Sequence, residues 1–208
     1  MSLFHDIHLL DQNLTLQVNS LHSVWSDHLW QFFSTKEVWF PMYLVIAVLL
    51  VMRLGWKKGL VAIASVIATI VACDQFANLV KDAVARLRPC HDPWMLEHGV
   101  RVLEGKANLY GFFSAHAANS FGFAVCSLMA FGNDKTRRYT AYDVCIVLWA
   151  LLVAASRIFV GKHYLGDVLA GMAVGVLFGW FFGAAARRII CKNSPRTPGS
   201  RSRSRRRS

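Results

Sequence analysis

The segment Ser156–Asp167 places an arginine, a histidine and an aspartate inside a chain that is otherwise largely apolar. Ionisable side chains at membrane depth are costly and usually mark a functional site. If the helix in the C-terminal third begins at His163, then His163 and Asp167 lie one turn apart on one face. A carboxylate there can fix the tautomer of an imidazole and stabilise its cationic form. The alternative is a surface ion pair where a loop joins a helix.

Two cations, Lys81 and Arg88, lie earlier in the chain at a spacing of seven residues. If the apolar segment before them continues as one helix, both side chains share a face of that helix. Pro89 would then end the helix, because proline restricts the residue before it to extended conformations. The alternatives are a solvated helix edge or a pair of anchors to lipid headgroups.

A serine and a histidine, Ser114 and His116, stand at the start of the next apolar segment. The first turn of a helix carries unpaired N–H groups that favour an anion. A single histidine here would more often be an interfacial residue than a catalyst. If Ser114 and His116 meet Lys81 and Arg88, and also the segment Ser156–Asp167, on one side of a membrane, a catalytic role is favoured.

The composition indicates a polytopic membrane protein. Hydrophobic residues make up 55% of the 208 residues and charged residues 17%, and the mean hydropathy is +0.37. A transmembrane helix needs about 20 mostly apolar residues. We therefore expect an all-α bundle of about five spans: Trp39–Trp56, Gly59–Val80, Phe112–Phe131, Tyr142–Val160 and Tyr164–Ala186.

Basic clusters orient these spans by the positive-inside rule. Such clusters lie between the first and second spans, between the third and fourth, and after the fifth. The C-terminus is therefore expected in the cytoplasm, with the N-terminus and the loops 81–111 and 160–163 outside. The outer segments are also cationic, against the rule, which suggests that these charges serve chemistry: Lys81, Arg86, Arg88, Arg101, Lys106, Arg157 and Lys162.

Residues 1–35 precede the spans. Apolar residues recur at helical spacing between Leu9 and Phe33 and include Trp25 and Trp30. Tryptophan favours the boundary between membrane and water. We predict one amphipathic helix in this segment, lying at the membrane interface.

The remaining chain divides into a transmembrane domain, residues 36–190, and a basic tail, residues 191–208. Nine of the 23 Lys and Arg residues lie in 187–208, which holds no Asp or Glu, so the rest is nearly neutral. We predict a disordered cytoplasmic tail that is attracted to anionic lipid. Nucleic-acid binding is not expected, although the Arg-Ser repeats are compatible with it.

Small residues recur at steps of about four in the fifth and third predicted spans. They are Gly171, Gly175, Gly179 and Gly183 in the fifth, and Ser114, Ala118 and Gly122 in the third. Small residues at this spacing let helix backbones approach closely in a bilayer. We expect these two spans to be direct partners, with His163 and Asp167 facing the bundle.

Together these residues resemble the three-part signature of the type 2 phosphatidic acid phosphatase / vanadium haloperoxidase superfamily, in its membrane lipid-phosphatase branch. The matching motifs are Lys81-x6-Arg88-Pro89, Ser114-Ala115-His116 and Ser156-Arg157-x5-His163-x3-Asp167. The middle motif departs from the family pattern Pro-Ser-Gly-His, because Phe113 and Ala115 replace proline and glycine. We expect the serine and histidine to keep their chemistry, and the local backbone, which in the family offers an amide to the phosphate, to be altered.

The resemblance implies a phosphate-binding site and a covalent mechanism. Three cations, Lys81, Arg88 and Arg157, would bind the phosphoryl oxygens. Ser114 and Ala115 would complete the phosphate-binding residues.

His163, held by Asp167, would attack phosphorus and form a phosphohistidine. His116 would protonate the leaving oxygen and then activate water. Three cations would take the place of a metal, so neither a metal nor another cofactor is expected.

The expected function is therefore an integral membrane lipid phosphatase that acts at the outer face, in a bacterial inner membrane. Undecaprenyl diphosphate is the favoured substrate; phosphatidylglycerophosphate, phosphatidic acid and a lipid A phosphate are the others that the family admits. A transporter is disfavoured because the cations gather at one face and do not cross the bilayer. A non-catalytic membrane scaffold is the remaining alternative, since the middle motif is altered.

Overall fold

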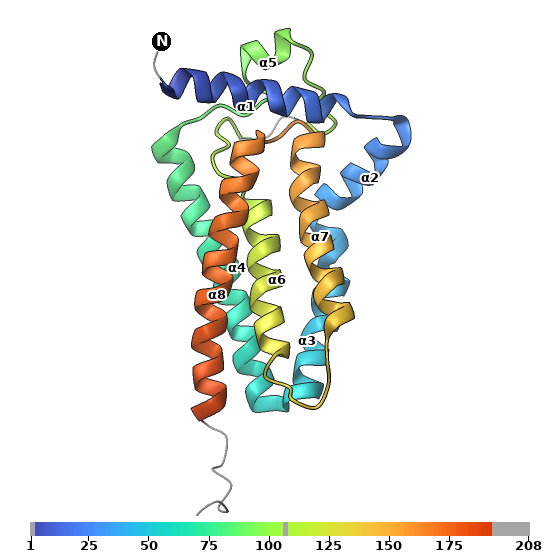
Figure 1. Cartoon of the computed structure of the whole chain (residues 1–208), viewed down its shortest axis with the longest axis vertical. Coiled ribbons are helices and arrows are strands. Elements are labelled where there is room, and N and C mark those ends of the chain that lie inside the picture. The colour runs from blue at the N-terminus through green and yellow to red at the C-terminus, as the bar shows by residue number, and fades with distance from the viewer. Residues whose placement is uncertain (1–2, 106–107, 193–208) are drawn as a thin grey trace, which may run out of the picture.

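The computed structural model describes residues 3–105 and 108–192, and the elements in these ranges are helical. Long helices run side by side in a bundle, and one helix crosses the bundle at one end (Figure 1). The bundle consists of α3 (Phe40–Leu54), α4 (Trp56–Val84), α6 (Ala115–Phe131), α7 (Thr140–Phe159) and α8 (Leu165–Lys192). The helices at the crossed end are α1 (Leu3–Ser20), α2 (Val24–Ser34), the 3₁₀ turn η1 (Lys36–Trp39) and the short α5 (Pro93–Glu97).

Four of the helical segments in the described part of the chain are long and apolar enough to cross a membrane. They are Lys36–Leu54, Trp56–Val84, Thr140–Phe159 and Leu165–Lys192. The third predicted span, Phe112–Phe131, corresponds to α6, which has 17 residues, or about 25 Å of helix, and lies in the interior against α4, α7 and α8. The predicted polytopic helix bundle is confirmed, with a short central helix in place of the third full span.

Helices α6 and α8 pack backbone to backbone, as their small residues predicted. A methyl group on Gly175 would lie 2.3 Å from the carbonyl oxygen of Ala118, and one on Gly171 would lie 2.4 Å from that of Ser114. Both distances are far below van der Waals contact, so only glycine allows this approach. The prediction that the third and fifth spans are direct partners is confirmed.

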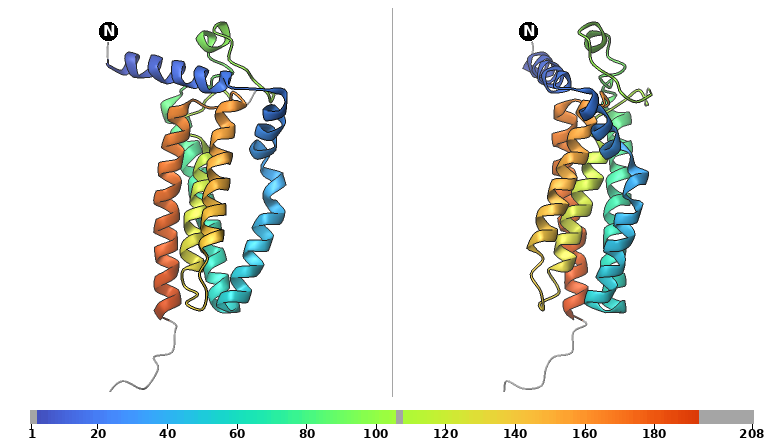
Figure 2. Two further views of the ribbon diagram at one scale, coloured as in Figure 1. Left: turned by 45° about the vertical axis from the view of Figure 1, so that its right-hand side comes forward. Right: turned by 90° about the vertical axis from the view of Figure 1, so that its right-hand side faces the viewer.

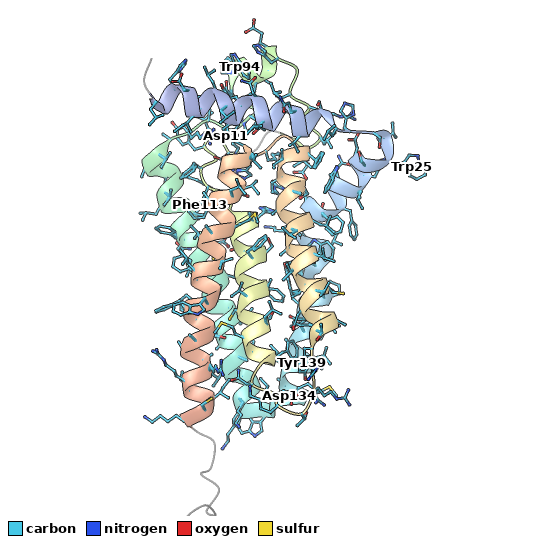
Figure 3. All side chains as sticks on the ribbon, viewed as in Figure 1. Asp11, Trp25, Trp94, Phe113, Asp134 and Tyr139 are labelled. Atoms are coloured by element: carbon cyan, nitrogen blue, oxygen red, sulfur yellow. The ribbon has the colours of Figure 1, made fainter. Side chains whose placement is uncertain are left out.

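The N-terminal segment forms two helices, so the prediction of one continuous helix from Leu9 to Phe33 is wrong. The chain turns because Ser23 caps α2: its hydroxyl accepts the N–H of Ser26, and the Ser26 hydroxyl accepts the N–H of Ser23. Such a capping box begins a new helix. Helix α1 crosses the bundle while α2 descends beside it toward α3, and Trp25 points away at the bend (Figures 2 and 3).

The opposite end of the bundle is closed by an ion pair. Arg53, at the end of α3, bonds the buried Asp134 at 2.8 Å and also the hydroxyl of Tyr139 at 3.0 Å. Asp134 and Tyr139 lie at the end of the bundle away from α1 (Figure 3). Hydrogen bonds from Thr136, Tyr139 and Arg53 hold the pKa of Asp134 well below its usual range. Arg53 thus ties α3 to the loop between α6 and α7.

The predicted basic tail lies outside the described residues from residue 193 on, and Lys106 lies outside them as well.

We predict that Gly175→Leu disrupts the fold and the activity together. The added side chain would have to displace the α6 backbone at Ala118, and overpacking of a close contact costs about 1–3 kcal/mol, occasionally more. Thermal unfolding in detergent measures the loss of stability. The matched control is Ala173→Leu, which adds a leucine at an exposed position of the same helix. A stable, fully active Gly175→Leu protein would contradict the packing described above.

Candidate active site

A cavity of about 640 Å³ lies between α3, α4, α6 and α7 and the loops that join them. Six of the eight sequence-predicted site residues line it: Lys81, Arg88, Ala115, His116, Arg157 and His163. The other two, Ser114 and Asp167, have no exposed surface and lie behind the cavity wall. The three sequence motifs, distant in the chain, therefore meet at one place.

The two cations of the first motif lie on different elements, so the prediction that they share one helix face is wrong. Helix α4 ends at Val84, and Ala85 follows in the left-handed region with a φ of 48°. The next residues leave the helix because they pair with the chain around Tyr110: Arg88 donates its N–H to Leu109 at 3.1 Å. Pro89 therefore does not end the helix, which has already ended five residues earlier.

His163 lies in the loop between α7 and α8, so the expected start of the last helix at His163 is also wrong. Helix α8 begins at Leu165, and Asp167 stands in its first turn. One oxygen of Asp167, Oδ2, accepts the N–H of Tyr164 at 3.1 Å and lies 3.6 Å from Nδ1 of His163. The carboxylate thus caps the helix and faces the imidazole, as the i, i+4 spacing suggested.

Arg88 determines which nitrogen of His163 carries the proton. Its Nη1 lies 2.9 Å from Nε2 of His163. A guanidinium only donates hydrogen bonds, so Nε2 is the acceptor and the neutral ring holds its proton on Nδ1, toward Asp167. Burial, followed by the charges of Arg88 and Arg157, holds the pKa of His163 well below its usual 6.5. Near pH 7 His163 is therefore a neutral imidazole with a lone pair on Nε2, which is the form a nucleophile requires.

Arg86 completes the surroundings of Asp167, a role that sequence reasoning missed. It donates from Nη1 to Oδ1 of Asp167 at 2.8 Å and from Nη2 to Oδ2 of Asp11 at 2.7 Å. Its guanidinium also lies over the ring of Tyr164, 4.0 Å from the ring centre. Asp11, on the side of α1 that faces the bundle (Figure 3), accepts the N–H of Gly166 with its other oxygen at 2.8 Å.

Further polar contacts hold α1 across the end of the bundle. Thr15 accepts the N–H of Leu165 at 2.9 Å, Asn19 donates to the carbonyl of Ile158 at 3.0 Å, and Gln12 donates to Asp92 at 2.9 Å. These partners lie 80 or more positions apart in the chain. No local pattern in the sequence pairs them, which is why only the folded structure reveals this role of α1.

The N-terminus of α6 presents His116 and the backbone amides of its first turn to the cavity. Ser114 is the N-cap: its hydroxyl accepts the N–H of Ala117 at 3.4 Å, and its own N–H donates to the carbonyl of Asp167 at 3.0 Å. Ser114 therefore joins α6 to α8. Its predicted contact with phosphate stays a prediction. Ala115 and His116, which do line the cavity, belong to the turn whose amides lack intrahelical acceptors.

Arg157 is almost completely buried and is held by groups that sequence reasoning did not assign. Its Nη1 contacts the carbonyl and the hydroxyl of Ser34, and lies 3.9 Å from a carboxylate oxygen of Glu104. The ammonium of Lys162 is also 3.9 Å from Glu104. Glu104 therefore supplies the negative charge nearest to two of the cations.

Comparisons with known proteins agree with this arrangement. Residues 58–190 match the profile of the PAP2 superfamily. The chain is 33% identical over 191 residues to a lipid A 4'-phosphatase of Bacteroides thetaiotaomicron, an alignment that covers 91% of this chain and 82% of that protein. It is 29% identical over 173 residues to a lipid A 4'-phosphatase of Porphyromonas gingivalis, covering 83% of this chain and 71% of that protein.

Solved structures share the fold. A PAP2-type phosphatidylglycerolphosphate phosphatase from Bacillus subtilis superposes with a TM-score of 0.72 at 15% identity, over 88% of both chains. LpxE from Aquifex aeolicus superposes with a TM-score of 0.63 at 19% identity, over 82% of this chain and 92% of that one. The profile match extends over more than half of the sequence and includes all three motifs, so the chain belongs to the PAP2 superfamily.

Proposed function

We propose that this protein removes a phosphate monoester from a glycolipid of the lipid A type, through a phosphohistidine on His163. The observation that carries the mechanism is the row Arg88–His163–Asp167, with 2.9 Å on the Nε2 side and 3.6 Å on the Nδ1 side of the ring. The substrate class is supported by the two relatives described above as lipid A 4'-phosphatases. Undecaprenyl diphosphate, the substrate that the sequence analysis favoured, is one of the alternative substrates in the test below.

The first step is attack by Nε2 of His163 on phosphorus. Arg88, Arg157 and Lys81 neutralise the phosphoryl oxygens, together with the amides at the start of α6, and this stabilises the charge of the transition state. As the bond from Nε2 to phosphorus forms, the ring becomes cationic, and the carboxylate of Asp167 stabilises the proton on Nδ1. The bond from phosphorus to the ester oxygen breaks, and His116, which enters this step as the protonated imidazolium, gives that oxygen its proton and becomes neutral.

The second step releases phosphate. His116, now neutral, takes a proton from water, and the oxygen of that water attacks phosphorus and displaces His163. The chemistry that a divalent metal supplies in other phosphatases falls to the cations, so hydrolysis is expected to proceed in the presence of a chelator.

The proposed orientation in the membrane is supported by the distribution of the charges. We place the cavity and α1 at the periplasmic face of a bacterial inner membrane, with α1 and α2 at the interface and the C-terminus in the cytoplasm. The exposed apolar side chains of the bundle, among them Leu44, Leu60 and Leu177, would contact lipid. A transporter is disfavoured because the cations that line the cavity, Lys81, Arg88 and Arg157, gather at the end of the bundle that α1 covers and do not form a path across the membrane.

We predict that the purified protein releases phosphate from a phosphorylated lipid, and that His163→Ala abolishes the release because no other group forms the covalent intermediate. The measurement is phosphate release from lipid A, undecaprenyl diphosphate and phosphatidic acid in detergent, with chelator or vanadate added in separate reactions. Release should survive the chelator and fall with vanadate.

His28→Ala, which removes an exposed histidine of α2, is the matched control and should remain active. Undiminished release by His163→Ala would rule out the phosphohistidine. Failure of the wild-type protein on every lipid would support the non-catalytic scaffold.

We predict that His163 titrates below pH 6.5, because its lowered pKa requires a lower pH before the ring takes up a proton. Arg88→Gln should move the titration upward, since it removes a neighbouring positive charge. Nitrogen chemical shifts of labelled histidine, assigned with His163→Ala, measure both midpoints. A midpoint above pH 6.5 in the wild-type protein would contradict the electrostatics described for the site.

We predict that Asp11 positions the catalytic pair from α1. Asp11→Asn removes the second anionic partner of Arg86, so Asp167 is less firmly held. We expect kcat to fall about threefold to tenfold, KM to stay nearly constant and the midpoint of His163 to shift. Asp6→Asn, an exposed change on the same helix, is the matched control. Equal effects of the two substitutions would show that Asp11 has no positioning role.

A further inference from the structure

We infer that Asp74 and Asn119 form a subsite for a hydrogen-bond donor on the lipid, next to the phosphate that is removed. The inference rests on the function proposed above and goes further, because it specifies which part of the substrate is recognised. The ligand group would be a sugar hydroxyl or an amide N–H of the carrier.

The first observation is a polar face on a membrane-spanning helix. Asp74, Asn78 and Lys81 of α4 lie at spacings of four and three residues, so they share one side of the helix, and all three line the cavity. At a rise of 1.5 Å per residue, Asp74 stands about 10 Å from Lys81 along the helix. The cavity therefore extends from the cations to a carboxylate two turns deeper in the bundle.

The second observation is how Asp74 is held. Asn119, one turn after His116 on α6, donates from Nδ2 to Oδ1 of Asp74 at 2.8 Å. Within the described part of the chain, the amide oxygen of Asn119 has no partner, and neither an ion pair nor a second hydrogen bond reaches Asp74. Asn119 thus fixes the carboxylate and leaves its Oδ2 unpaired at the cavity wall.

This arrangement is costly as a purely structural element. An ionisable group at membrane depth requires compensation, and a buried amide oxygen without a partner adds a desolvation cost of its own. Both costs are explained if a ligand donor completes the network.

The ligand donor belongs to the carrier and not to the phosphate. A phosphate monoester carries negative charge at neutral pH and would be repelled by a carboxylate. A hydroxyl or an amide N–H would instead donate to Oδ2. The glycerol esters of phosphatidic acid and the hydrocarbon of a polyprenyl diphosphate offer no such donor near the phosphate, whereas an N-acylated glucosamine does.

The test compares two substrates on one variant. The substrates are an N-acylglucosamine lipid phosphorylated at the 4-position and dioctanoyl phosphatidic acid. We expect Asp74→Asn to lower the ratio of kcat/KM for the glycolipid to kcat/KM for phosphatidic acid about tenfold, since a charge-assisted hydrogen bond is lost. Asn119→Ala, which leaves the carboxylate in place but unfixed, should lower the ratio in the same direction by a smaller factor.

The matched control is Asp82→Asn, which removes a negative charge from an exposed position next to Lys81 and should leave the ratio unchanged. Melting in detergent verifies that each variant is folded. A ratio that stays constant in both Asp74→Asn and Asn119→Ala would overturn the subsite, while phosphate release from the glycolipid would leave the proposed function standing. Absence of release from either lipid by the wild-type protein would instead overturn the proposed function, and the subsite with it.

Discussion

The close contact between α6 and α8 is the constraint on which the catalytic arrangement depends. With glycine at 171 and 175, the backbone of α8 reaches the carbonyl groups of Ser114 and Ala118. At that distance the N–H of Ser114 can donate to the carbonyl of Asp167. The start of α6, with His116, and the start of α8, with His163 just before it, therefore face one cavity. A side chain between the two helices would separate the two histidines.

A second constraint is the concentration of positive charge at one end of an apolar bundle. The protein compensates this charge with anions drawn from distant parts of the chain. Asp11 and Asp167 share Arg86, and Glu104 lies beside Arg157 and Lys162. Lys81 and Arg88 line the cavity and have no carboxylate partner as close as these among the described residues, which leaves them available for the phosphoryl group of the proposed reaction. The helices that precede the family region thus contribute to the active site as electrostatic partners.

The sequence predicted the class of fold and six of the residues that line the cavity, because both depend on signals that are local in the chain. Apolar segments of sufficient length identify spans, and the three motifs identify the charged groups. The helix ends were less predictable. Proline at position 89 indicated a boundary, but the helix ends at Val84 because residues 86–88 pair with the chain around Tyr110. The bend at Ser23 and the contact between Asp11 and Arg86 depend on capping geometry and on pairing across the fold, which periodicity does not report.

The contact between Arg88 and Nε2 of His163 makes the reactivity of this histidine depend on what else Arg88 binds. In the proposed mechanism the lone pair on Nε2 of His163 attacks phosphorus, and in the structure Nη1 of Arg88 lies 2.9 Å from that atom. Arg88 would leave Nε2 only for a group that attracts a guanidinium more strongly than a neutral imidazole does. A phosphoryl dianion is such a group. Under that mechanism the charge that identifies the substrate would also free the nucleophile, whereas an uncharged electrophile would meet a histidine that is already hydrogen-bonded to Arg88.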